Sequence, residues 1–154
     1  MTLAMATSFP DRWTAASAWV PLSDLGAWYD FHKLDEYGEM TRACLGGDPA
    51  EDSGIAAEMK RRSPLLNMAR AIEVPLDIAA GRFDGHEGAP VPIWHSLAAY
   101  NAVALASGES TISAAEIAQL SRPNARLDHP RQSDDLMDPA FGRKTYSLRT
   151  SCNS

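Results

Sequence analysis

The residues best suited to chemistry lie in a glycine-rich loop, residues 81–88, which follows an apolar run over residues 74–80. Asp84 lies within this loop. In open α/β sheets the loops at the carboxyl ends of the strands face the crevice that binds ligands, so this position suits a catalytic carboxylate. An aspartate beside glycine is, however, most often a turn former. Asp77 is the rival acid, but it lies inside the apolar run, where a buried carboxylate needs a structural partner.

The histidines do not form a recognisable metal or catalytic motif. His86 and Glu87 begin like the H-E-x-x-H zinc motif, but the fifth position is Pro90, so we interpret them as a polar loop tip. His95 is predicted to be a partly buried helix residue. His129 is the only candidate base late in the chain, and no strand precedes it.

The other potential ligands are equally unspecific. Cys44 and Cys152 belong to no pair such as C-x-x-C, and we interpret them as reduced thiols. Asp134, Asp135 and Asp138 lack the glycine and the closing glutamate of a calcium loop, which favours solvated loop charge. The sequence therefore predicts no metal and no cofactor.

Apolar periodicity predicts the elements that position the loop. Residues 14–20 and 74–80 are continuous apolar runs, typical of strands buried on both faces of a parallel sheet. Helical patterns surround them, and this order is typical of an α/β fold, because parallel strands need helical crossovers. The predicted helical segments are residues 2–9, 23–31, 35–45, 48–62, 65–71 and 92–106.

The end of the chain has a different composition. A capping box, Ser113 to Glu116, predicts a short helix over residues 113–120. Residues 122–154 contain three prolines and few aliphatic side chains, and only residues 145–148 suggest extended structure. We therefore predict one domain, formed by residues 1–108, with residues 109–154 as an irregular excursion.

Two parallel strands are too few for a stable sheet. Both outer edges would be unpaired, and parallel sheets normally have helices on both faces. This physical argument predicts further strands outside the sequence.

Composition and charge argue against some classes of binding partner. The chain has 154 residues, is 45% apolar and carries a net charge of −6. A negative charge argues against nucleic-acid binding, which needs clustered cations. No apolar run approaches the roughly 20 residues of a membrane helix, so no membrane partner is expected. Residues 1–4 lack the basic stretch of a signal peptide.

Three phrases, in order, resemble prolyl oligopeptidase-like serine peptidases, a family of the α/β-hydrolase fold. The first is P-D-R-W-T-A-A followed by P-L-S-D-L, at residues 10–16 and 21–25. The second is R-S-P-L followed by V-P-L-D-I, at residues 62–65 and 74–78. The third is A-G-R-F-D-G, residues 80–85. The resemblance covers about residues 2–106.

The resemblance implies a partial α/β-hydrolase fold that lacks the strands before the nucleophile elbow and the last strand. It implies that Asp84 is the acid of a Ser-His-Asp triad. The serine would lie in a G-x-S-x-G-G turn directly before Met1, and the histidine in a G-H loop beyond Ser154. The full-length protein would cleave a peptide or ester substrate without a cofactor, and this chain alone would be inactive.

The sequence also departs from the family pattern. Ala80 replaces the histidine before the loop glycine, and residues 85–90 lengthen the loop. These departures leave exopeptidase, endopeptidase and esterase activities open, as well as a non-catalytic, hydrolase-like binding protein. An aromatic cluster, Trp28, Tyr29, Phe31 and His32, is interpreted either as lining for a substrate pocket or as an anchor for its helix.

Overall fold

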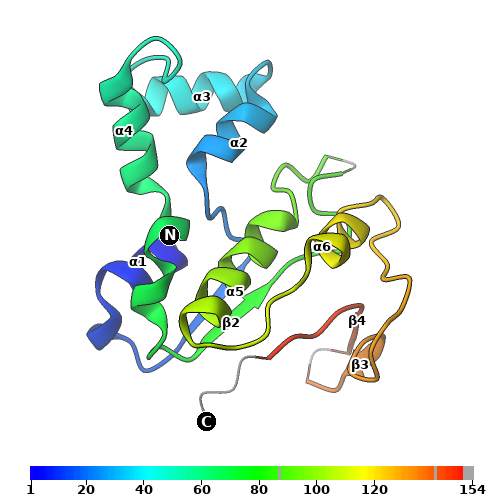
Figure 1. Ribbon diagram of the computed structural model, residues 1–154. Helices are drawn as coiled ribbons and strands as arrows, with labels where there is room; N and C mark the ends of the chain where they lie inside the picture. The colour runs from blue at the N-terminus through cyan, green and yellow to red at the C-terminus, as the bar shows by residue number, and fades with distance from the viewer. Residues whose placement is uncertain (87, 141, 151–154) are drawn as a thin grey trace.

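The computed structural model describes residues 1–86, 88–140 and 142–150, and it combines helices with two small sheets (Figure 1). Most predicted elements are present, with boundaries shifted by a few residues. The helical segments are α1 Thr2–Ser8, η1 Pro10–Arg12, α2 Leu25–His32, α3 Glu36–Leu45, α4 Ser53–Arg62, η2 Pro64–Ala71, α5 Trp94–Ala106 and α6 Ala114–Leu120. The strands are β1 Ala16–Trp19, β2 Leu76–Ala79, β3 Leu136–Asp138 and β4 Arg143–Thr145.

The strands β1 and β2 pair in parallel, with Ala16 opposite Leu76 and Trp19 opposite Ala79. The predicted parallel pair is therefore confirmed. The carboxyl ends of both strands lie at the same end of the sheet, and the loop that contains Asp84 begins there. Among the described residues, no third strand joins this sheet.

One face of the sheet carries the core. Helices α1 and α5 contact the strands, and η2 lies between these two helices. The side chains at the centre are small or flexible, which lets the helices approach the sheet closely. They are Leu3, Ala18, Met68 and Ala99, with Leu65, Leu76, Ile78, Ala102 and Val103 packed against them.

The other face of the sheet, called the open face below, is covered only in part, by the C-terminal segment, whose Arg143 guanidinium lies 4.3 Å from the centre of the Trp19 ring. The prediction of strands buried on both faces was therefore wrong. Ser17, Trp19 and Asp77 are exposed there. Ser17 Oγ donates to Asp77 Oδ2 at 2.8 Å and accepts from Trp19 Nε1 at 2.8 Å. Asp77 thus has the expected partner but is not buried, because polar side chains alternate with apolar ones on these short strands.

Helices α2, α3 and α4 form an arm that projects away from the sheet (Figure 1). Each begins at an aspartate whose carboxylate accepts backbone N–H groups of the first turn: Asp24, Asp35 and Asp52. Helix α4 was predicted to begin near Asp48. That residue instead accepts the hydroxyl of Tyr29 at 2.9 Å, and Asp52 is the cap.

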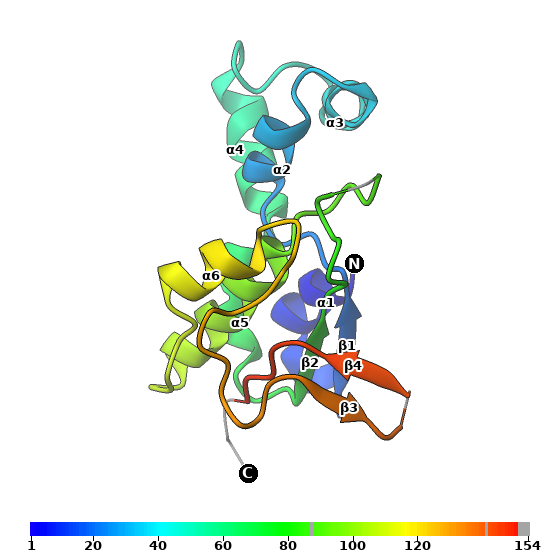
Figure 2. The ribbon, with the colours of Figure 1, turned by 90° about the vertical axis from the view of Figure 1, so that its right-hand side faces the viewer.

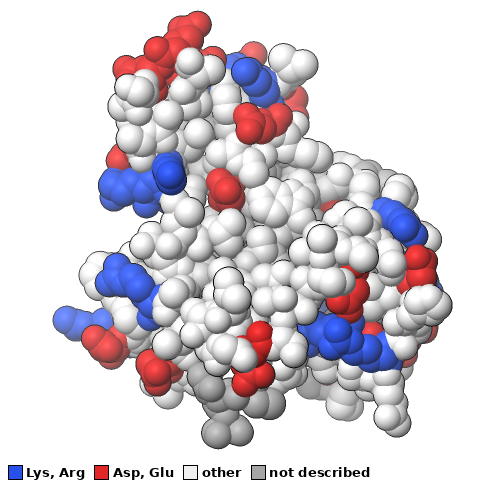
Figure 3. All heavy atoms as spheres, in the orientation of Figure 1, with Lys and Arg blue, Asp and Glu red and all other residues white. Residues whose placement is uncertain are grey.

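In the space-filling view the arm rises from the body over a narrower waist (Figure 3). On the face shown, acidic and basic side chains occur in separate small groups. This face therefore has no extended cationic surface of the kind that binds a phosphate backbone.

The C-terminal segment contains a strand that sequence reasoning missed. The strands β3 and β4 form an antiparallel hairpin that lies in front of the β1–β2 sheet in Figure 2, over its open face, where Arg143 of β4 stacks on Trp19 of β1. Residues 145–148 were the predicted extended segment, but β4 ends at Thr145. Exposed side chains dominate both strands, so neither shows the apolar alternation that marks a half-buried strand.

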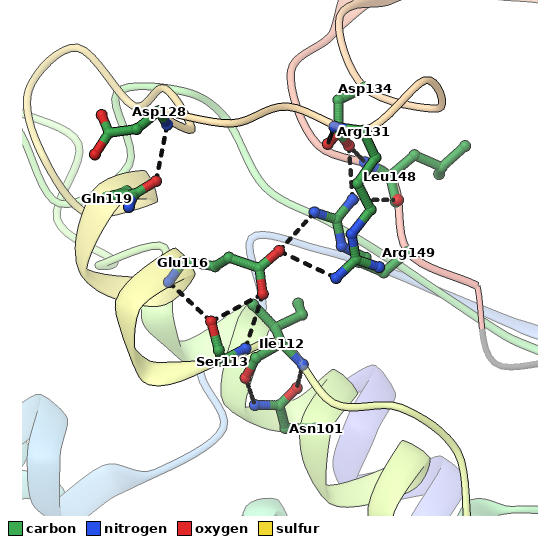
Figure 4. A network of polar contacts seen from close by, with 10 residues as sticks. All are labelled: Asn101, Ile112, Ser113, Glu116, Gln119, Asp128, Arg131, Asp134, Leu148 and Arg149. Carbon is green, nitrogen blue, oxygen red and sulfur yellow. Dashed lines mark hydrogen bonds and ion pairs between the residues drawn. The ribbon is translucent and has the colours of Figure 1, made fainter.

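A buried ion network fastens this segment to α6 (Figure 4). Arg149 donates to Asp134 at 2.7 Å and to Glu116 at 2.8 Å. The Asp134 side chain is fully buried, so the prediction of solvated loop charge was wrong for this residue. Its true partner lies 15 residues later and could not be read from local pattern.

Within the described ranges, no helix has the length and apolar character needed to cross a membrane.

Candidate functional site

The Asp84 loop folds back on the end of β2. Asp84 Oδ2 accepts the backbone N–H of Gly81 at 2.6 Å. A Cβ added to Gly81 would lie 2.9 Å from Asp84 Oδ1, so a side chain at this position would require the carboxylate to shift. Oδ1 accepts no hydrogen bond from the described residues. The carboxylate is therefore held by one oxygen, and the other is available.

The environment of Asp84 is partly desolvated. Burial raises the pKa of its carboxyl above the ordinary value, and the N–H of Gly81 opposes this effect. A carboxylate with one fixed oxygen and one unused acceptor can orient a group that carries an N–H, such as an imidazole.

Backbone hydrogen bonds close the loop on itself. The N–H of Gly85 donates to the carbonyl of Ala89 at 2.9 Å, and the N–H of Ala89 donates to the carbonyl of His86 at 2.9 Å. Gly85 has φ +84°, and a Cβ there would lie 2.7 Å from Pro92 Cα. The lengthened part of the loop is thus compact and packs on the start of α5. Glu87 lies outside the described residues.

Two side chains tie the loop to the C-terminal segment. His86 Nε2 contacts the carbonyl of Ser121 at 2.8 Å, and Arg82 Nε donates to the carbonyl of Asn124 at 3.0 Å. His86 is half-buried. It is therefore a loop-fastening residue rather than the solvated polar tip that was predicted.

The aromatic cluster fastens the arm. Trp28, Tyr29 and His32 are buried, whereas Phe31 is 55% exposed. His32 Nε2 contacts the carbonyl of Pro90 at 2.8 Å, at the end of the Asp84 loop. Anchoring is thus the role of three of the four side chains.

His95 is buried at the base of the arm. Its Nδ1 faces the backbone N–H groups of Ser23 and Asp24, each at 3.4 Å, and the Ser23 hydroxyl donates to the His95 carbonyl at 2.8 Å. Burial lowers the pKa of His95 to about 4, and the nearby Asp24 opposes this effect. His95 was predicted to be partly buried, but it is fully buried. Its imidazole is neutral, because Nδ1 must accept hydrogen bonds from the backbone N–H groups.

The remaining candidates are not brought to this loop. Asp77 lies on the open face of the sheet, and His129 and Cys44 are exposed. Cys152 lies outside the described residues. Among the residues that the structure describes, no group of three His, Cys, Asp or Glu side chains is arranged to hold a metal ion.

A cavity of about 600 Å³ lies between the β1–β2 sheet, helix α5 and the β3–β4 hairpin. Its apolar wall includes Ile78, Leu97 and Tyr100, and charged side chains such as Arg82 and Lys144 also line it. On helix α5, the half-buried Leu97 and Tyr100 face the cavity, whereas the fully buried residues of the helix include His95 and Ala99.

The bonds of His32 and His86 were not anticipated. Each reaches a backbone carbonyl that is distant in sequence, and no residue type or spacing signals such a partner.

Searches against protein-family models, curated proteins and solved structures found no match to this chain.

Proposed function

We propose that this chain is part of a serine hydrolase of the α/β-hydrolase fold that cleaves peptide or ester bonds. In this proposal residues 1–108 are part of the catalytic domain, and Asp84 is the acid of a Ser-His-Asp triad. The serine and the histidine belong to segments of a longer polypeptide on either side of this sequence.

The observation that carries the proposal is the position of Asp84. It lies in a tight loop directly after a parallel strand, at the sheet edge where α/β proteins bind ligands. One oxygen is fixed by Gly81 and the other is unused, which is the arrangement needed to hold an imidazole. The triad acid holds its histidine in the correct tautomer and stabilises the imidazolium that forms.

The unfinished sheet is a second support. Pro75 and Ala79 bond β1 through their carbonyls, so by alternation the backbone groups of Leu76 and Ile78 point toward the outer edge of β2. In the proposal a further strand of the longer polypeptide pairs with this edge and brings the histidine to Asp84.

The proposed chemistry is acyl transfer. The serine hydroxyl attacks the carbonyl carbon while the histidine takes its proton, and the leaving group then receives that proton. Water repeats the sequence on the acyl-enzyme. Asp84 acts only by orienting and stabilising the histidine.

The coding sequence on both sides provides the first test. We expect G-x-S-x-G-G to end at Met1 and a G-H pair to follow Ser154. Stop codons immediately on both sides would overturn the proposal and leave the non-catalytic binding protein as the better interpretation.

The second test uses the full-length protein and a matched pair of aspartates. Asp84→Asn is expected to lower kcat by about 10⁴-fold, because the histidine is held in the wrong tautomer. Asp77→Asn, on the open face of the sheet, should retain activity. A fluorophosphonate probe should label the full-length protein but not the 154-residue chain; a labelled chain, or equal activities of the two variants, would contradict the proposal.

A further inference from the structure

The contact between His32 and Pro90 is the point where the arm meets the Asp84 loop. His32 is the last residue of α2, and it is 5% exposed. Its Nε2 lies 2.8 Å from the Pro90 carbonyl oxygen. A backbone carbonyl only accepts, so Nε2 donates.

The imidazole is held from its other side by Asp35. Nδ1 lies 2.6 Å from Asp35 Oδ2. The second oxygen of this carboxylate caps α3 by accepting the backbone N–H groups of Tyr37 at 2.9 Å and Gly38 at 3.3 Å. Because the cap fixes the carboxylate, it also fixes the direction of the ring.

The surrounding packing leaves the ring little freedom. The ring centroid of Trp28 lies 4.1 Å from that of His32, and Phe31 and Tyr37 lie at 4.8 and 4.9 Å. A Cβ at Gly38 would overlap the carbonyl oxygen of His32, so α3 packs directly on this residue. The side chain is therefore oriented before it meets the loop.

A displacement of the Pro90 backbone would also displace Asp84, because backbone hydrogen bonds connect the two ends of the loop. Ala89, the preceding residue, bonds both Gly85 and His86, which follow Asp84 in the chain. None of the described loop residues, 81–86 and 88–90, is fully buried, and such segments open readily unless tied down.

We infer that His32 is a positioning residue, which holds the Asp84 loop in place through the Pro90 carbonyl and couples the α2–α4 arm to it. The relevance to catalysis rests on the proposed function, but the positioning itself is a property of this chain. His32 does not contact the reacting atoms.

The test compares His32→Ala, which removes the donor, with His32→Gln, whose amide can still donate to Pro90. His129→Ala, at an exposed histidine, is the control. Amide hydrogen exchange of Gly81, Gly85 and Ala89 is measured by NMR in the 154-residue chain. We expect about tenfold faster exchange in His32→Ala, the factor that corresponds to about 1.4 kcal/mol for one hydrogen bond.

The pattern of effects separates positioning from general destabilisation. His32→Gln and His129→Ala should exchange at nearly the wild-type rate, and amides of α1 and α5 should be unchanged in all three variants. The titration of Asp84, followed by the ¹³C shift of its carboxyl, should move toward the ordinary value only in His32→Ala.

Unchanged loop exchange in His32→Ala, equal acceleration in α5, or failure of glutamine to restore protection would each overturn the inference. No step requires activity. A negative result therefore leaves the proposed function to its own tests, and flanking stop codons would leave this inference intact.

Discussion

At the scale of single residues, the Asp84 loop depends on two glycines that share a backbone conformation but differ in surroundings. Gly85 has φ +84° and Gly88 has φ +85°, both in the left-handed region. A side chain at Gly88 would meet open space, whereas one at Gly85 would meet the backbone of Pro92. Conformational strain and steric overlap can therefore be separated.

Alanine at these two positions should give unequal losses of stability. Gly88→Ala is expected to cost about 1 kcal/mol, the cost of left-handed backbone alone. Gly85→Ala should cost at least about 2 kcal/mol, because the loop must also move away from Pro92. Urea denaturation measures both free energies of unfolding. Equal losses would mean that the loop moves without cost and that its packing on α5 is loose.

The same scale shows what the sequence could reveal. The capping box that begins at Ser113 was predicted, because a capping residue bonds backbone only two or three positions away. Arg149 and His32 were not assigned their roles, since their partners lie far along the chain or on the backbone. The position of Asp84 after a strand was predicted from local pattern; its triad role stays a prediction.

At the scale of elements, the arm is attached to the body by two neighbouring segments. Ser63, after α4, accepts the N–H of Leu25, the first residue of α2, at 2.9 Å. The N–H of Leu65 donates to the Ser23 carbonyl at 2.9 Å. The arm thus has its own hydrogen-bonded base, which explains how three helices can project from a small core.

Loss of the Ser63 hydroxyl should weaken this base. Ser63→Ala leaves the partly buried N–H of Leu25 without its acceptor and is expected to lower the free energy of unfolding by about 1–2 kcal/mol. Ser53→Ala, at an exposed site on α4, is the matched control and should change it by less than about 0.5 kcal/mol. Faster amide exchange should be confined to α2 and α4; faster exchange throughout α5 would show that the arm and body unfold as one unit.

The sequence predicted helices and strands correctly where the local pattern extends over many residues. It failed where the burial of a strand depends on segments far away in the sequence. Helices α1, α3 and α5 were predicted to within two residues at each end, because turn residues and caps mark them locally. The continuous apolar runs of β1 and β2 predicted strands but not their open face. The hairpin was missed because exposed side chains dominate both strands, so the apolar alternation that marks a half-buried strand is absent.

At the scale of the whole molecule, one buried histidine and one partly buried glutamate link stability to pH in separate ranges. His95 joins the arm to α5, and its pKa falls from 6.5 to about 4 because of burial. Glu116 joins α6 to the C-terminal segment, and the hydrogen bond from Arg149 lowers its pKa from 4.5 to about 2. Both pKa values are depressed, so both contributions are present at neutral pH and are lost on acidification.

The expected unfolding free energy therefore falls in two stages. The contribution of neutral His95 is complete above about pH 6.5 and is lost as the pH falls through 4; the pKa change corresponds to roughly 3 kcal/mol at about 1.4 kcal/mol per pH unit. The contribution of Glu116 is complete above about pH 4.5 and is lost toward pH 2.

In His95→Asn the amide oxygen can replace Nδ1 as acceptor, so this variant should lose only the first stage. Arg149→Met should lose only the second, although it is less stable at every pH because Asp134 stays buried without its cation. Urea denaturation at several pH values measures each slope, and a His95→Asn slope identical to wild type between pH 6.5 and 4 would show that the buried imidazole is not the group being titrated.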